Sequence, residues 1–379
     1  MTSSRVKLIL LGVFLLSLFI GTDFALAKEK IGIESCLELQ KIGNHPSYPL
    51  DGDYFLKKDI DCKETSSWND GLGFDPIDSF KGVFDGRGYV IANLFIDRSE
   101  NEIGLFGVIE KEGEVFSLGL LDIEIKGEDY TGGLGGMIKG KVEEVFVTGE
   151  VKGRHLVGLL SGELLEEGEI RNSYARGSAE GVEIVGLISG EIWDGFIENT
   201  YALGEVKGGD NIGGLVGENL GSGEIKHSYF LGEIFSQGEN VGVLLGYNEG
   251  DLINSFYYNE EELDCVGEGN SEECFMVSYK ERFYDYDDPE IYSNWDFGSI
   301  WSDYYKGEDF PVLSWQIEEE IKTPSLSKKQ NKVIPWYRNP LYQEESKEAF
   351  RDLKESLDNA SKILSDMISL LEEEIERRG

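Results

Sequence analysis

Residues 211–235 read NIGGLVGENLGSGEIKHSYFLGEIF, and variants of this unit recur through the middle of the chain. Its first element begins with an apolar residue and glycine and closes on another glycine. Six segments share this pattern, and their closing glycines lie 26 to 29 residues apart: 103–107, 131–136, 157–162, 185–190, 212–217 and 241–246. A fixed period of this size indicates stacking of one supersecondary unit.

A second element follows each glycine element and ends in an aromatic residue. It reads Ile-Lys-His-Ser-Tyr at 225–229, with similar copies at 170–174 and 197–201 and looser ones at 142–146 and 252–256. The aromatic position recurs every 27 or 28 residues, as Phe146, Tyr174, Tyr201, Tyr229 and Phe256. This spacing predicts a ladder with one ring per coil, packed in the core or between coils rather than offered to a sugar.

A third short element follows the aromatic residue, as in Gly-Glu-Val-Lys-Gly at 149–153 and 204–208. Three short strands separated by glycine-containing turns predict a three-sided coil and an all-β solenoid. Helical repeats do not fit, because each glycine costs about 1 kcal/mol inside a helix. Apolar residues three apart, such as Ile212 and Leu215, also predict a bend inside the glycine element.

The glycine element at 213–217 and the segment 225–229 together resemble the GLUG motif of bacterial and archaeal surface proteins. Residues 80–94 are similar to the segment that precedes such repeats, and the likeness extends over about residues 33 to 315. It implies a right-handed parallel β-helix displayed outside the cell, often in adhesins, with no shared activity. The copies at 157–162 and 185–190 depart from the motif. They carry Leu159 and Leu187 where a second glycine is usual, and Ser161 and Ser189 where valine is usual, which places the bend in question there.

The formal net charge is -38. Such a charge repels nucleic acids and anionic bilayers, so the sequence predicts no nucleic-acid partner. No segment matches an EF-hand or the nonapeptide calcium repeat, and there is no His-Glu-x-x-His motif. We therefore expect no metal, no cofactor and no zinc protease.

The N-terminal residues have the features of a signal peptide. Arg5 and Lys7 precede an apolar run from Leu8 to Gly21, and residues 25–27 (Ala-Leu-Ala) suit a cleavage site before Lys28. The run is shorter than the about 20 residues that span a bilayer. We expect a secreted or cell-surface protein.

The four cysteines fit an oxidising compartment and flank the repeats. Pairing across a rod is geometrically impossible, because bonded cysteines need Cα atoms within about 7 Å. The expected structural disulfides are therefore Cys36–Cys62 and Cys265–Cys274. The first would contribute about 3 to 4 kcal/mol by the chain-entropy model.

Beyond the repeats, aromatic residues predict a hydrophobic C-terminal cap, at Tyr284, Tyr286, Tyr292, Trp295, Trp301, Tyr304 and Tyr305. Apolar residues near the C-terminus occupy heptad positions, at Phe350, Leu353, Leu357, Ala360, Leu364, Met367 and Leu371. They predict an amphipathic helix that either docks on the rod or forms a short coiled coil through which the protein self-associates. The expected segments are a signal peptide (1–27), an N-terminal cap (28–78), the repeats (79–260), a C-terminal cap (261–316), a linker (317–342) and the helix (343–379).

The favoured function is a non-enzymatic binding or adhesion module for an extracellular glycan or protein. Exposed aromatic and polar rungs on a solenoid face suit such binding. The alternative is a polysaccharide lyase or hydrolase, since two carboxylates about 5 to 9 Å apart could act on glycosides. No acidic pair stands out among the 73 acidic residues, so the sequence predicts no catalytic residue.

Overall fold

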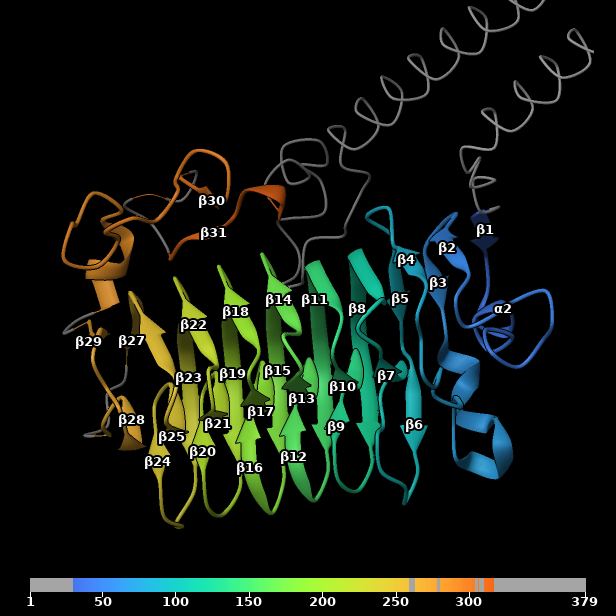
Figure 1. The fold of residues 1–379 in the computed structure, drawn as a ribbon, viewed down its shortest axis with the longest axis horizontal. Coiled ribbons are helices and arrows are strands. Elements are labelled where there is room, and N and C mark those ends of the chain that lie inside the picture. Colours follow the sequence, from blue (N-terminus) through green and yellow to red (C-terminus); the bar gives the residue numbers. More distant parts are fainter. Residues whose placement is uncertain (1–29, 259–262, 278–279, 304–305, 307–309, 317–379) are drawn as a thin grey trace, which may run out of the picture.

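The computed structural model describes residues 30–258, 263–277, 280–303, 306 and 310–316. In these ranges the chain winds into a parallel β-solenoid whose coils stack along one axis (Figure 1). The predicted all-β parallel β-helix is confirmed. The expected signal peptide, linker and C-terminal helix lie outside the described residues.

Two narrow parallel sheets form two sides of the stack. The five-stranded sheet contains β9 (Thr131–Gly132), β12 (His155–Gly158), β16 (Glu183–Gly186), β20 (Ile212–Gly213) and β24 (Val241–Gly242). The seven-stranded sheet contains β7 (Phe106–Ile109), β10 (Gly135–Ile138), β13 (Ser161–Leu165), β17 (Ser189–Trp193), β21 (Val216–Leu220), β25 (Leu245–Asn248) and β28 (Val266–Gly269).

The third side is a broad sheet that runs along the whole stack. Its N-terminal strands are β1 (Lys30–Ile33), β2 (Asp53–Leu56), β3 (Ile60–Asp61), β4 (Val83–Asp85), β5 (Val90–Ala92), β6 (Phe95–Asp97), β8 (Glu114–Lys126) and β11 (Lys141–Lys152). Its later strands are β14 (Glu169–Arg171), β15 (Tyr174–Glu180), β18 (Phe196–Glu198), β19 (Tyr201–Lys207), β22 (Glu224–Lys226), β23 (Tyr229–Phe235), β26 (Asp251–Ile253), β27 (Ser255–Tyr258) and β29 (Cys274–Met276).

Short elements flank the coils. Helix α2 (Cys36–Leu39) lies at the N-terminal end (Figure 1), where the Ser35 side chain accepts a hydrogen bond from the Glu38 amide. The other short elements are the 3-10 turns η1 (Lys63–Ser67), η2 (Asn69–Gly71) and η3 (Lys280–Tyr284) and the antiparallel pair β30 (Trp301–Ser302) and β31 (Val312–Leu313). No helix in the described part of the chain is long and apolar enough to span a bilayer.

The glycine element forms two strands, so a middle coil has four strands where three were predicted. In the coil of residues 155–180, β12 ends at Gly158 and β13 begins at Ser161. A Cβ at Gly158 would collide with the backbone oxygen of Ser161, so the bend requires glycine there. The same bend occurs in the next coil between β16 and β17, although Leu187 replaces the motif glycine.

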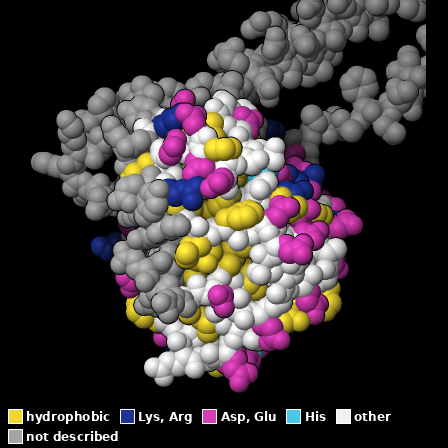
Figure 2. Space-filling view, turned by 90° about the vertical axis from the view of Figure 1, so that its left-hand side faces the viewer, with side chains coloured by type: hydrophobic (Ala, Val, Ile, Leu, Met, Phe, Trp, Pro, Cys, Tyr) yellow, Lys and Arg dark blue, Asp and Glu magenta, His cyan; other side chains and the backbone are white. Residues whose placement is uncertain are grey.

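The coils extend beyond the predicted repeat range of 79–260. Parallel pairing begins where β1 meets β2 and continues to β28 and β29. Figure 2 views the C-terminal end, where apolar side chains lie near the centre and acidic ones around them. Phe275 and Met276 of β29 are 42% and 54% exposed. The last coil thus leaves apolar surface open at this end.

Inward side chains are matched in size across the coil interior. In the coil of residues 183–207, Leu187 occupies the glycine element and Ala202 follows the ladder tyrosine. In the next coil the same two positions are Gly214 and Phe230, and Ala202 and Phe230 are in register. A Cβ at Gly214 would collide with the Phe230 ring. In the coil of Leu187, the departure from the glycine motif is therefore matched by a smaller residue, Ala202, on the opposite side.

Each second element turns a corner at its third residue. Asn172 and Asn199 have φ values of 48° and 51°, which asparagine tolerates better than most residues. The next residue points inward: the Ser173 hydroxyl donates to the Arg171 carbonyl and accepts from the Val145 amide. The Asn-Ser-Tyr order thus sets a turn, a buried hydroxyl and an outward aromatic ring.

Candidate functional site

The aromatic ladder lies outside the coil interior. Its rings belong to a hydrophobic cluster separate from the one that fills the coils. Ring centroids are 5.2 Å apart for Phe146 and Tyr174, and 5.0 Å for Tyr174 and Tyr201 and for Tyr201 and Tyr229. Interplanar angles of 2° to 8° make these rings a near-parallel stack along the rod.

A C-terminal strap, the described residues between 283 and 316, covers this ladder from outside. The Tyr229 hydroxyl donates to the Pro311 carbonyl at 2.6 Å, and the Gln316 amide nitrogen donates to the Tyr201 hydroxyl at 2.7 Å. The Trp315 ring stacks on Tyr174 at 5.7 Å. The predicted C-terminal cap therefore lies along the flank of the rod (Figure 1), and the covered rings offer no ligand platform.

The cysteines are paired within each end of the rod. Cys36 is bonded to Cys62 with a Cα separation of 5.6 Å, and Cys265 to Cys274 with a Cα separation of 6.4 Å. The first bond ties helix α2 to the loop after β3. Both disulfides hold the ends of the stack.

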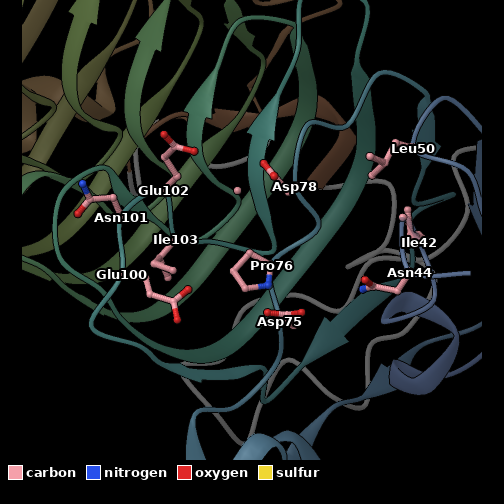
Figure 3. A pocket seen from close by; sticks show the side chains of 12 residues that line it. Ile42, Asn44, Leu50, Asp75, Pro76, Asp78, Glu100, Asn101, Glu102 and Ile103 are labelled. Carbon is pink, nitrogen blue, oxygen red and sulfur yellow. The ribbon is translucent and has the colours of Figure 1, made fainter.

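An acidic hollow of about 430 Å³ opens near the N-terminal end of the rod. Three chain segments line it: residues 42–50, 75–78 and 100–107. Figure 3 shows Asp75, Pro76 and Asp78 between the other two groups. Four carboxylates surround the hollow, and apolar side chains complete its wall, at Ile42, Leu50, Pro76 and Ile103.

The wall of this hollow is held by specific polar contacts. The Gln40 side chain accepts from the Asp75 amide at 2.8 Å and donates to the Asp75 carbonyl at 2.9 Å. The Arg98 side chain is 8% exposed and lies 3.1 Å from an Asp75 carboxylate oxygen and 3.7 Å from one of Glu100. A buried guanidinium thus steadies two of the carboxylates, while Asp78 and Glu102 also face the hollow.

A second acidic feature is the carboxyl row, formed by Glu163, Glu191 and Glu218. These residues are in register on β13, β17 and β21, so their side chains stack on the outer face of the seven-stranded sheet. All three are half-buried. The row follows directly from the sequence, because each glutamate comes one residue after the closing glycine of its repeat.

Burial governs the ionisation of this row. Burial, together with the charges of Glu163 and Glu218, raises the pKa of Glu191 to about 8. Burial also raises the pKa of Glu163 and Glu218, while a hydrogen bond from Asn211 acts in the opposite direction at Glu218. At neutral pH Glu191 therefore holds a proton, so the row can both donate and accept hydrogen bonds.

Neither acidic feature has the geometry of a metal centre. Within the described residues, no group of three or more histidine, cysteine, aspartate or glutamate side chains could hold a metal ion. The hollow and the carboxyl row are suited to hydrogen bonding with a ligand rich in hydroxyl groups. Sequence reasoning identified neither feature, although the recurring Gly-Glu pair was visible in the repeats.

Comparisons with known proteins bear on the repeats and the fold. No protein-family model matches the chain. The chain is 35% identical over 142 residues to halomucin from Haloquadratum walsbyi, in a match that covers 34% of this chain but only 2% of halomucin. A solved structure from Bacteroides ovatus, of a protein provisionally named an immunoglobulin A1 protease, superposes with a TM-score of 0.56 at 20% identity over 75% of this chain and 92% of that one. The chain is thus a β-solenoid repeat protein similar to a segment of halomucin, and membership in the GLUG-motif family stays a prediction.

Proposed function

We propose that the protein acts outside the cell, secreted or on the surface, as a non-catalytic binding and adhesion module for an extracellular glycan. The similarity to a protein named as a mucin supports this location, as do the two disulfides. The acidic hollow carries the binding part of the proposal.

The chemistry of the hollow favours a sugar. Carboxylates such as Asp78 and Glu102 accept hydrogen bonds from ligand hydroxyl groups. The half-buried side chains of Leu50 and Pro76 suit the C–H face of a pyranose ring. Aspartate and glutamate side chains supply most of its polar groups, so an anionic ligand would be repelled.

An array of immobilised neutral glycans that contain no extended β-1,4-linked chains tests this function. The wild-type chain is expected to be retained, and the double variant Asp78→Asn/Glu102→Gln to lose most of its signal. The control Glu124→Gln/Glu150→Gln makes the same charge change at exposed positions of the broad sheet and should bind normally.

The array also separates binding from catalysis. Retention without release of reducing or unsaturated sugar ends supports a binding module. Release of such ends by the wild-type chain would instead establish a carbohydrate-active enzyme. If the array retains the hollow variant as well as the wild type, the hollow does not bind the glycan.

A further inference from the structure

The outer face of the seven-stranded sheet carries an exposed aromatic edge beside the carboxyl row. Leu165, Trp193 and Leu220 are in register and lie two residues beyond the row glutamates on the same strands. Residues two apart in a strand point to the same side, so both rows face outward. Trp193 is 52% exposed, which is unusual for a tryptophan in a well-packed coil.

The opposite edge of the row is polar. The Asn211 amide donates to a Glu218 carboxylate oxygen. Near the other end of the row, the charges of Glu163 and Glu191 and its own burial raise the pKa of the Tyr130 phenol. The face therefore has hydrogen-bonding groups along its middle and a large aromatic ring along one edge.

We propose that this face binds a single extended chain of a neutral β-linked polysaccharide, laid along the axis of the rod. Neighbouring coils are about 4.8 Å apart, so the row repeats its hydrogen-bonding groups at short, regular intervals along such a chain. The Trp193 ring stacks on the apolar face of one pyranose, and the row exchanges hydrogen bonds with hydroxyl groups beside it. This site is separate from the acidic hollow and does not depend on it.

The surrounding charges favour a neutral chain. The whole molecule carries a net charge of -38, which opposes the approach of anionic polysaccharides. Near the row, Lys139 lies 3.3 Å from Glu166 and 3.6 Å from Glu110, and His155 lies 3.2 Å from Glu183. Further charges nearby are Asp129, Glu249 and Glu268. Lys139 is paired with two glutamates, so it is not free to hold an anionic sugar.

Calorimetric titration of the full chain at pH 6 with cellohexaose, xylohexaose and mannohexaose tests the proposal. At least one of these extended β-1,4-linked hexamers should bind, and the flexible α-1,6-linked isomaltohexaose should bind less tightly. Trp193→Ala should weaken binding at least about tenfold, or about 1.4 kcal/mol. Trp193→Phe, which keeps an aromatic ring, should restore most of the affinity.

Three further variants complete the design. Phe235→Ala removes a ring that is 47% exposed on the broad sheet, and it should leave the affinity unchanged. Raising the pH to 9 should weaken wild-type binding as the row ionises, while Glu191→Gln should reduce this loss. Binding of none of the three hexamers, or equal binding by Trp193→Ala and wild type, would overturn the proposal. The hollow variant Asp78→Asn/Glu102→Gln should bind these hexamers normally, which keeps the two sites distinguishable.

Discussion

At the scale of single residues, the carboxyl row links folding to pH. The pKa of Glu191 is raised from its ordinary 4.5 to about 8 by burial and by its glutamate neighbours. The folded state thus holds a proton that the unfolded state releases, and stability falls as the pH rises from about 4.5 to about 8. Glu191→Gln should reduce this dependence and stabilise the fold at pH 9 by about 1–2 kcal/mol, after allowance for solvent screening. Urea denaturation of the wild type and of Glu191→Gln at pH 5 and pH 9 measures this difference in unfolding free energy. An equal pH dependence of stability in the two proteins would contradict the raised pKa of Glu191.

The matched interior gives a second prediction at this scale. Gly214→Leu should destabilise the fold because the new side chain collides with the Phe230 ring, and Phe230→Ala should destabilise it by leaving a cavity. Together they reproduce the Leu187 and Ala202 pair of the preceding coil. The double variant should therefore recover at least about 1 kcal/mol relative to the sum of the single variants. If denaturant unfolding shows that the two single losses of stability simply add in the double variant, the two side chains do not compensate for each other's volume.

At the scale of elements, the strap depends on its buried tryptophans. Trp301 is 1% exposed and its ring lies 4.4 Å from that of Trp295 and 5.9 Å from that of Tyr229. Trp301→Ala should cost about 3–5 kcal/mol and release the strap from the ladder. Hydrogen exchange should then increase in β19 and β23. Trp193→Ala, at a half-exposed site, serves as control and should change neither stability nor exchange appreciably.

The strap also marks a limit of sequence reasoning about this fold. The period of Tyr174, Tyr201 and Tyr229 predicted a ladder, but an inward row and an outward row have the same period. The outward position depends on contacts between residues far apart in sequence, such as Tyr229 with Pro311, which are 82 residues apart. The hollow likewise combines three distant segments. By contrast, a bend inside the glycine element was readable from apolar residues three apart, such as Ile212 and Leu215, because glycine reaches the bent backbone conformations without steric cost.

At the scale of the whole molecule, each coil contacts mainly its neighbours, so the two ends can lose structure separately. The predicted self-association through residues 343–379 belongs to this scale. If those residues form a coiled coil, deleting them should reduce the mass of the particle measured by light scattering to that of one chain. An unchanged mass would favour the alternative, a helix that docks on the rod of its own chain.

The two disulfides should differ in their contribution to this stack. The Cys36–Cys62 bond closes a separation of 26 residues and the Cys265–Cys274 bond one of 9. The chain-entropy model assigns them about 3.5 and about 2.6 kcal/mol. Cys36→Ser/Cys62→Ser should therefore destabilise the fold more than Cys265→Ser/Cys274→Ser, and hydrogen exchange should increase first around α2 and β1. The strap donates a hydrogen bond to Asn172 and packs its rings on Phe256, both on later coils. If exchange in the first coils stays at the wild-type rate, helix α2 and the buried side chains there hold the N-terminal end without the covalent bond.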